Sequence, residues 1–215
     1  MAKNQIILIP AFNELDSLKK VIKSCPNNWK ILVVDDCSKD KTINFLKKKK
    51  IQYIKNKKNL GYEKSILKGF NYALKSKKFE FIATLDSDGE HNPKYLNKMM
   101  KIMINKNLDM VVAERSNYNR TSEAIIGKIY NLKFNISDPL SGYKLYRKES
   151  LSLVIKKIKT CFFLVDIINL IKHNSGKIGS LYTVSKKRKE GKPKVGGNFF
   201  VNLKILILII LFFYY

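Results

Sequence analysis

Short apolar runs alternate with segments of helical periodicity over the first half of the chain. The apolar runs cover residues 5–9, 30–34, 51–54, 79–85 and 109–113, and each has the length of a buried strand. Between them, apolar residues recur at helical spacing over residues 14–24, 41–49, 62–74 and 93–104. Strands that alternate with helices are typical of parallel sheets, so this pattern predicts an α/β fold with a mostly parallel sheet.

The second half of the chain has a looser pattern. It predicts a helix over residues 122–134, a strand over 144–147, a helix over 164–171 and a strand over 178–184. A basic loop that contains glycine follows at residues 185–197, and an apolar stretch begins at residue 199. A chain of 215 residues fits one domain with an appendage. We therefore predict one domain over residues 1–197 and an apolar, membrane-associating helix over 198–215.

The apolar tail is short for a membrane span. A spanning helix needs about 20 apolar residues, and Lys204 interrupts this stretch. We expect a helix embedded in one leaflet, with a core or oligomer-interface helix as the alternative. The basic run at residues 186–189 favours an acidic cytoplasmic leaflet, and no signal peptide precedes the first predicted strand. These features predict a peripheral or monotopic protein on the cytoplasmic side of a membrane.

The net charge of +25 comes almost entirely from lysines that are spread over many segments. Because the chain has no zinc-finger spacing, RNP-like aromatic block or basic heptad region, we predict no nucleic-acid partner. A basic surface favours small anionic partners such as nucleotide diphosphates, or an acidic leaflet. The three cysteines share no metal-ligand spacing and are expected to be free thiols in a reducing compartment.

Carboxylates follow two of the predicted strands. Asp35 and Asp36 end the second strand, and Asp86 and Asp88 follow the fourth. In parallel α/β sheets ligands bind beyond the carboxyl ends of the strands. Hard divalent cations take oxygen ligands and usually keep substrate phosphates as co-ligands. The pattern therefore predicts a Mg²⁺ or Mn²⁺ site that bridges the phosphates of a nucleotide, although an Asp-x-Asp triplet alone is a weak signal.

Four further sequence motifs strengthen the evidence from the Asp-x-Asp triplet. In chain order the five are Pro-Ala-Phe-Asn-Glu at 10–14, Val-Val-Asp-Asp-Cys-Ser at 33–38, Asn-Leu-Gly-Tyr at 59–62, Asp-Ser-Asp-Gly-Glu-His at 86–91 and Asp-Pro-Leu-Ser-Gly-Tyr-Lys at 138–144. Together they resemble family 2 glycosyltransferases, and among these the dolichol-phosphate mannosyltransferase-like subgroup. The resemblance covers about residues 5–197 and implies a GT-A-type, Rossmann-like domain that binds a nucleotide sugar.

The resemblance also implies roles for the loops after the first three strands. The first loop would hold the base and ribose through Pro10, Ala11, Phe12 and Glu14. Asp35 or Asp36 would contact the nucleoside. For these acids, capping of the following helices is the structural alternative. Asn59, Gly61 and Lys64 would lie by the phosphates at a helix N-terminus, where Gly61 could equally serve only the turn.

The remaining implied roles concern the reaction itself. Asp86 and Asp88 would hold metal and nucleotide, with Glu90 as a further ligand where the subgroup often has Gln, while His91 is expected to be a packed or solvated loop residue. The resemblance places four groups of residues around the transferred sugar and the diphosphate: Arg115 on the diphosphate, Asp138, Ser141 and Gly142 by the sugar, Asp166 as a helical acid, and Arg188 and Lys192 in a covering loop. Among them, Asp88, Arg115, Asp138 and Asp166 are the candidate catalytic residues.

The implied reaction is metal-dependent transfer of a sugar, with inversion, from a nucleotide diphosphate to a polyprenyl phosphate. One alternative is transfer to a sugar hydroxyl of a cell-surface glycan, with Asp138 or Asp166 as the base. Another is a catalytically weak sugar-nucleotide-binding membrane protein, because Cys37, Glu114 and Pro193 depart from the family pattern. A homo-oligomer and a membrane-protein partner both stay open.

Overall fold

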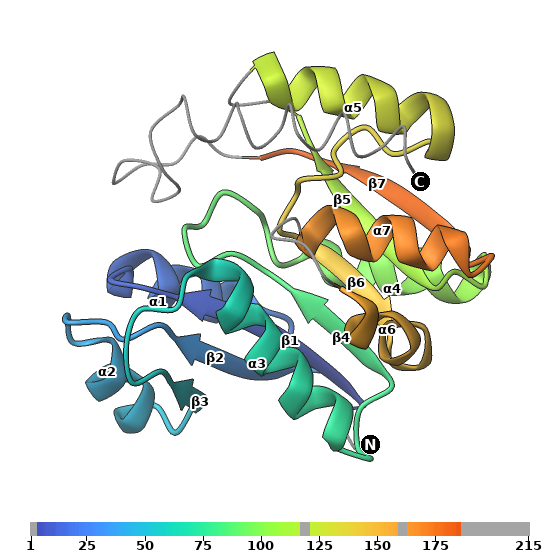
Figure 1. Cartoon of the computed structure of the whole chain (residues 1–215). Helices are drawn as coiled ribbons and strands as arrows, with labels where there is room; N and C mark the ends of the chain where they lie inside the picture. Colours follow the sequence, from blue (N-terminus) through green and yellow to red (C-terminus); the bar gives the residue numbers. More distant parts are fainter. Residues whose placement is uncertain (1–3, 117–120, 159–162, 186–215) are drawn as a thin grey trace.

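The computed structural model shows a seven-stranded sheet with helices on both faces (Figure 1). It describes residues 4–116, 121–158 and 163–185. The strands are β1 (Gln5–Ala11), β2 (Lys30–Asp35), β3 (Gln52–Lys55), β4 (Phe81–Thr84), β5 (Met110–Arg115), β6 (Lys144–Arg147) and β7 (Ile178–Thr183). Their order across the sheet is β3-β2-β1-β4-β6-β5-β7. β6 runs antiparallel to β4 and β5, and the other pairs are parallel, so the predicted mostly parallel sheet is confirmed.

The helices form two layers around the sheet. One layer holds α1 (Leu15–Ser24), α2 (Thr42–Lys48) and α4 (Tyr95–Asn105). The other holds α3 (Tyr62–Lys75), α5 (Thr121–Phe134), α6 (Lys148–Val154) with the short 3₁₀ turn Ile155–Lys157, and α7 (Phe163–His173). Strands buried on both faces read as continuous apolar runs, which explains the composition of the sheet.

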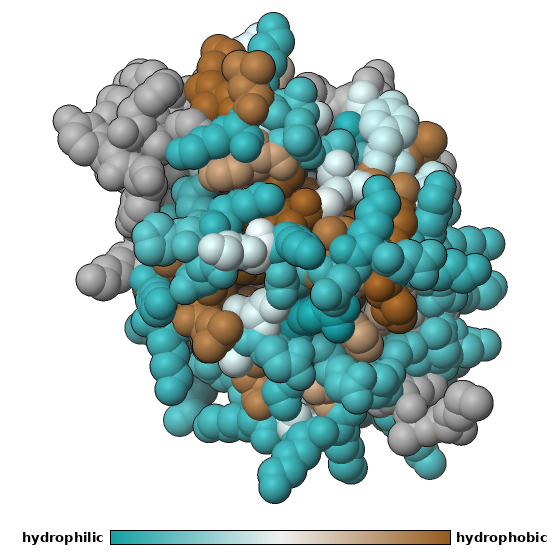
Figure 2. All heavy atoms as spheres, turned by 90° about the vertical axis from the view of Figure 1, so that its right-hand side faces the viewer, coloured by the Kyte–Doolittle hydropathy of each residue, from teal (hydrophilic) through white to brown (hydrophobic). Residues whose placement is uncertain are grey.

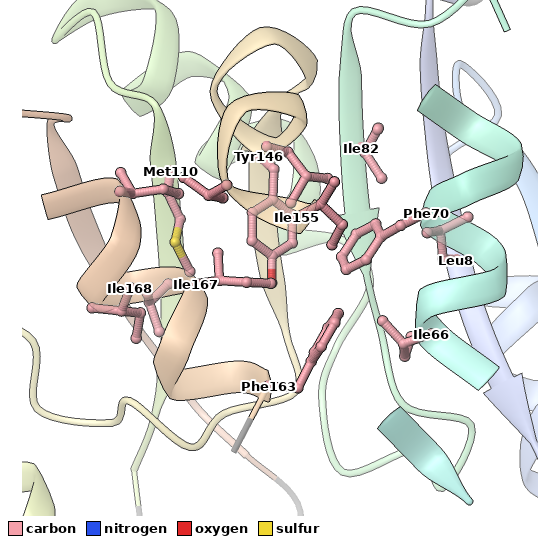
Figure 3. Close-up of a cluster of buried hydrophobic side chains, with 14 of the residues drawn as sticks. Leu8, Ile66, Phe70, Ile82, Met110, Tyr146, Ile155, Phe163, Ile167 and Ile168 are labelled. Atoms are coloured by element: carbon pink, nitrogen blue, oxygen red, sulfur yellow. The ribbon is translucent and has the colours of Figure 1, made fainter. Parts of the chain in front are cut away.

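Aromatic rings join the sheet to the second layer. Phe70 of α3 meets Tyr146 of β6 edge to face, with ring centroids 5.3 Å apart, and stacks on Phe163 of α7 at 5.7 Å. Figure 3 shows these rings among aliphatic side chains from β1, β4, β5 and α7. Each offset or edge-to-face pair stabilises the fold by about 0.5–1.5 kcal/mol beyond the contribution from burying the apolar surface of the rings. The contact fixes α3 and α7 on either side of the antiparallel strand β6.

A buried side-chain hydrogen bond links two elements of the first layer inside its apolar core. Trp29, which is 2% exposed, donates a hydrogen bond from Nε1 to Asn97 Oδ1 of α4 at 3.0 Å. A buried indole N–H needs such a partner, so Asn97 compensates for the burial of the ring. This pair holds the start of β2 against α4.

The predicted strands and helices are confirmed over the described residues. Three helices begin later than predicted, α1 and α2 by one residue and α4 by two. Before α4, residues 92–94 form a turn in which Tyr95 N donates to Asn92 O at 3.2 Å. The α6 helix and the 3₁₀ turn were not predicted. The predicted apolar helix over 198–215 lies outside the described residues, and within the described ranges no helix is long and apolar enough to span a bilayer.

Candidate active site

The loops that carry the predicted site meet at one edge of the sheet. β1, β2 and β4 are adjacent and parallel, so the loops after them leave from the same side. β6 is antiparallel, and its preceding loop, residues 138–143, therefore arrives at that side as well. β5 ends there with Arg115. The topology thus gathers four of the five sequence motifs together with Arg115.

The loops after β1 and β2 are fastened to each other. Asn13, with φ of 52°, accepts a hydrogen bond from Lys39 N at 2.7 Å, and its own N–H donates to Ser38 Oγ at 3.0 Å. Asp36 N donates to Ala11 O at 2.8 Å. Pro10 and Ala11 are buried at the end of β1, while Phe12 is half-buried beyond it. The predicted base-binding loop is therefore held in place by the β2 loop.

Asp40 caps two helices at this edge. Its Oδ2 accepts from Leu15 N of α1 at 3.2 Å, and its Oδ1 accepts from Thr42 N of α2 at 3.0 Å. Glu14 precedes α1 but makes no capping bond with its side chain. Its Oε2 instead accepts a short hydrogen bond from Ser87 Oγ, the middle residue of the Asp-Ser-Asp triplet. Glu14 therefore links the first loop to the metal loop.

The two acids that end β2 have different surroundings. Asp36 accepts hydrogen bonds from Asn56 Nδ2 and Leu60 N at 2.8 Å each, and from Gly61 N at 2.9 Å. It holds the loop before α3 in shape, which favours a structural role. Asp35 is fully buried and uses only Oδ2, which accepts from Ser38 N at 3.2 Å, while its Oδ1 has no hydrogen-bond partner. Of the two, Asp35 fits the predicted nucleoside contact better.

The loop before α3 combines a turn that requires glycine with exposed positions. Gly61 has φ of 86°, a conformation that glycine adopts without the steric cost of a side chain. Asn59 Oδ1 accepts from Gly61 N at 3.2 Å. Asn59 and Lys64 are both exposed, and Lys64 lies on the first turn of α3. The predicted phosphate contacts are thus on an accessible loop whose shape depends on Asp36 and Gly61.

Asp86 is half-buried and packs against the backbone of Gly142. A Cβ placed on residue 142 would lie 2.4 Å from Asp86 Oδ2, so only glycine leaves room for this carboxylate. Asp86 Oδ1 is buried and has no hydrogen-bond partner. Burial, with the charges of Asp88 and Glu90 adding to it, raises the pKa of Asp86 to about 7. Tyr62 and Arg115 oppose this rise in pKa. A carboxylate oxygen without a hydrogen-bond partner, next to the carboxylates of Asp88 and Glu90, fits a site for a cation.

The other two predicted metal ligands follow on the same loop. Asp88 Oδ1 accepts a hydrogen bond from Glu90 N at 3.0 Å. Over the described ranges, no three His, Cys, Asp or Glu side chains form a group that could hold a metal ion. The donor set therefore fits a cation held by one or two carboxylates that takes its remaining ligands from substrate phosphates. Glu90 as a third ligand remains a prediction.

Arg115 and Asp138 form a buried ion pair. Asp138 Oδ2 accepts from Arg115 Nε at 2.7 Å and from Arg115 N at 3.2 Å, while its Oδ1 accepts from Nη2 at 3.0 Å. The same Nη2 donates to Glu123 Oε2 of α5 at 3.2 Å. Such bidentate bonds to a guanidinium are strong and directional. Arg115 is thus held by two carboxylates of this chain, and its predicted contact with the diphosphate remains a prediction.

Glu114 explains one departure from the family pattern. Its Oε1 accepts a hydrogen bond from Ser137 N at 2.6 Å, and its main-chain oxygen accepts from Thr183 Oγ1 of β7 at 3.0 Å. Burial raises the pKa of the Glu114 carboxyl, which the bond from Ser137 partly opposes. The side chain therefore anchors the residue just before Asp138. From the sequence, Glu114 is only a mismatch with the family pattern, and this role was missed.

Lys144 is a second residue that sequence reasoning missed. It is fully buried, and burial lowers the pKa of its ammonium to about 7. Its Nζ donates to Pro139 O at 2.8 Å and to Leu164 O at 3.2 Å. It thereby ties the loop before β6 to the start of α7. The available signal was its position at the start of a predicted strand, directly after the block that contains Asp138.

The remaining candidates lie around this centre. His91 is buried and packs on Tyr143 with ring centroids 5.1 Å apart, as a packed loop histidine should. Ser141 N donates to Asp138 O at 3.2 Å, which shapes the loop. Asp166 is half-buried on the first turn of α7, near Tyr130 of α5. Arg188 and Lys192 lie outside the described residues.

Sequence comparison gives one family and several relatives. The family model described as Glycosyl transferase family 2 matches residues 6–153. A UDP-N-acetylglucosamine–dolichyl-phosphate N-acetylglucosaminyltransferase of Methanococcus voltae is 25% identical, over 93% of this chain and 94% of that protein. A dodecaprenyl-phosphate galacturonate synthase of Rhizobium johnstonii is 23% identical, over 96% and 66%. An uncharacterized protein of Methanocaldococcus jannaschii is 39% identical over 51% of each, so this chain matches about half the length of that relative.

Solved structures share the fold at low sequence identity. Glucosyl-3-phosphoglycerate synthase from Mycobacterium tuberculosis, in complex with Mn²⁺, uridine diphosphate and glucosyl-3-phosphoglycerate, has a TM-score of 0.70 at 15% identity, with coverage of 89% of this chain and 73% of that one. Residues 1–349 of Staphylococcus aureus TarS, in complex with UDP-GlcNAc, have a TM-score of 0.65 at 18% identity, with coverage of 97% and 66%. These likenesses confirm the predicted GT-A-type fold.

Proposed function

Since the chain belongs to glycosyl transferase family 2, we propose that it transfers a sugar from a nucleotide diphosphate to a polyprenyl phosphate, with inversion, at a membrane surface. One observation carries the choice of acceptor. Both carboxylate oxygens of Asp138 accept hydrogen bonds from Arg115, at 2.7 and 3.0 Å. Because the guanidinium engages both oxygens, neither is presented freely to an acceptor hydroxyl, whereas an acceptor that is already an anion at neutral pH needs no general base.

The donor half of the proposal is supported by the edge of the sheet. Asp35 and Asp86 each bury an oxygen without a hydrogen-bond partner, and such oxygens are costly unless a ligand completes them. Asp35 would bind the nucleoside, and Asp86 with Asp88 would hold Mg²⁺ or Mn²⁺ with the diphosphate. When bound, the metal supplies Lewis-acid stabilisation of the charge on the departing diphosphate.

The chain's own residues orient the reactants. Gly142 leaves room beside Asp86, and the loop before β6 fixes where the sugar would lie. Arg115, buried between Asp138 and Glu123, contributes a positive charge close to the carboxylates of this edge. Two anions must meet at one anomeric carbon, so positioning supplies much of the expected rate enhancement. The attacking oxygen belongs to the acceptor phosphate, and the bond to the nucleotide breaks on the opposite face.

The relatives support the acceptor class. The Methanococcus voltae protein, matched over nearly its whole length, is named for a dolichyl-phosphate acceptor, and the Rhizobium johnstonii protein for a dodecaprenyl phosphate. A lipid acceptor also agrees with the proposed site of action, a peripheral position on the cytoplasmic side of a membrane. A glycan hydroxyl is the second candidate acceptor. With Asp138 held by Arg115, the base for that reaction would fall to Asp166 on α7.

Transfer by the purified full chain tests the proposal. The assay supplies a panel of nucleotide sugars, Mn²⁺ or Mg²⁺, and a detergent-solubilised polyprenyl phosphate. Formation of a sugar-phosphoryl lipid is expected with at least one donor, and Asp88→Ala should abolish metal-dependent donor binding while Glu90→Gln is tolerated. Undiminished donor affinity in Asp88→Ala with metal present would refute the metal assignment. Transfer only to a sugar hydroxyl would refute the acceptor.

A further inference from the structure

The α5 helix carries apolar side chains on two opposite faces. Ile126 and Tyr130 are buried against the sheet and α7. On the outer side, Ile125 is 53% exposed and Leu132 is 89% exposed. A helix that is apolar on both sides is typically covered on both sides. Within the described residues the inner face has its cover, and the outer face does not.

The outer apolar residues form one stripe. Ile125 and Leu132 are spaced at i and i+7, so they lie in line along the helix, and Ile129 between them is half-buried and packs against the inner core. Two exposed lysines of the same helix, Lys128 and Lys133, flank the stripe.

The charges around the stripe are positive. Lys133 Nζ lies 5.4 Å from the Phe134 ring, and Lys172 of α7 approaches the same ring at 6.0 Å. The only acid of α5, Glu123, is buried and paired with Arg115 at 3.2 Å. The outer side of α5 therefore combines an apolar stripe with basic residues and no carboxylate of its own.

The end of β7 carries two further exposed side chains near the candidate site. Tyr182 and Val184 are each 63% exposed. Ser185 N donates to Ser116 Oγ at 3.3 Å, and Ser116 directly follows Arg115. The last described residues of the chain thus lie beside the strand end that carries the ion pair. In the sequence they are followed by the basic run at 186–189.

The figures show the same arrangement. α5 and β7 lie together at one end of the molecule in Figure 1. Hydrophobic atoms gather at that end of the molecule in Figure 2, above a face that is mostly hydrophilic.

We propose that the outer face of α5, together with Tyr182 and Val184, rests on an anionic lipid bilayer. Lysines beside an apolar stripe suit a headgroup region, where the apolar side chains insert and the ammonium groups meet lipid phosphates. The inference rests on the proposed function in taking a bilayer as the partner. It adds a contact surface that is separate from the C-terminal stretch, and it turns the strand end with Arg115 towards the membrane.

Tryptophan fluorescence tests the contact in the full chain. The sole tryptophan, Trp29, is 2% exposed and gives a constant background. Leu132→Trp places a reporter in the stripe, and Ile104→Trp places one at a site that is 55% exposed on α4, in the opposite layer. With acidic vesicles whose acyl chains are brominated, the emission added by Leu132→Trp should be quenched, and that added by Ile104→Trp should not.

Three outcomes would overturn the inference. The first is unquenched emission from Leu132→Trp while the protein sediments with the vesicles. The second is emission from Leu132→Trp that is already blue-shifted without vesicles and unchanged by them, which would mean that the chain's own C-terminal segment covers α5. The third is a blue shift that depends on protein concentration, which would indicate a second copy.

A charge substitution gives a second readout. Leu132→Glu should reduce sedimentation with acidic vesicles, whereas Ile104→Glu should not. If both variants sediment with the vesicles as fully as the unsubstituted protein does, the proposal is contradicted. Transfer to a detergent-solubilised acceptor is measured in parallel. Intact transfer without quenching would overturn the α5 contact alone, and quenching without lipid transfer would overturn only the proposed acceptor.

Discussion

The carboxylate of Asp86 occupies space that any side chain at residue 142 would need, since a Cβ there would lie 2.4 Å from Asp86 Oδ2. Gly142 is therefore fixed by a neighbour that is remote in sequence. The site depends on this close approach, because it places a buried, partnerless oxygen of Asp86 at the sheet edge.

Gly142→Ala should displace Asp86 and weaken metal-dependent donor binding, with a loss of stability of about 1–3 kcal/mol from overpacking. Gly179→Ala is the matched control. Its Cβ would lie 2.6 Å from Leu108 Cδ1, in β7 and away from the metal loop. Calorimetric donor titrations and thermal unfolding of both variants check the prediction, which fails if the two lose donor affinity to the same extent.

The contribution of Asp86 to the stability of the metal-free protein should fall as pH rises from about 4 to about 7, while buried His91, whose pKa is lowered to about 4, contributes with the opposite sign. The folded-state pKa of Asp86 is raised from 3.8 to about 7, so in this window the folded state binds the proton more tightly than the unfolded state does. Each step up in pH therefore removes part of the contribution of Asp86. Asp86→Asn should flatten this slope, and Mn²⁺ should raise the melting temperature more at pH 8 than at pH 6. Equal Mn²⁺ shifts at both pH values would contradict the assignment.

Asp138→Asn should lower activity by weakening the hold on Arg115, and the loss should not depend on pH. Glu123→Gln is the control, since Glu123 holds the same guanidinium at 3.2 Å and is no candidate base. The two variants should lose similar activity. A general base would instead show a loss of about 10²–10⁴-fold in Asp138→Asn alone. Profiles of kcat/KM against pH for both variants distinguish these roles.

Cys37→Gly should stabilise the protein. Cys37 has φ of 67°, and a left-handed conformation costs a residue with a side chain roughly 1–2 kcal/mol. Glycine also raises the conformational entropy of the unfolded chain, which offsets part of this stabilisation. The free energy of unfolding should therefore rise by a net amount of about 0.5–1 kcal/mol. Cys37→Ala keeps the strain and should show no gain. Urea unfolding of the two variants measures the difference.

The sequence predicts most of the fold because strand and helix periodicity are local properties. The predicted strand ends are also enough to place Asp35 and Asp86 at one edge of the sheet. Asp138 joins them only because β6 runs antiparallel, which the sequence pattern does not predict. The partners of these acids are not predictable in the same way. Asp36 bonds to a loop 24 residues further on through Leu60 N, and Glu14 receives its bond from Ser87, so neither contact has a local signal.

The same limit applies to Glu114 and Lys144. A family comparison reads Glu114 as a mismatch, whereas its bond to Ser137 N depends on the antiparallel placement of β6 next to β5. Lys144 starts β6, and its burial depends on carbonyl groups of the preceding loop and of α7. Tertiary contacts, rather than spacing, decide what these residues do.

The central claim, that the nucleophile is a lipid phosphate, is tested most directly with two acceptors that differ only in that group. The full chain, a nucleotide sugar that binds, and Mn²⁺ are supplied with equal amounts of a polyprenyl phosphate and the corresponding polyprenol. Sugar transfer to the phosphate, with none to the alcohol, is the expected result. Transfer to the polyprenol at a comparable rate would contradict the account, because a hydroxyl nucleophile needs a general base and the account assigns none to the reaction.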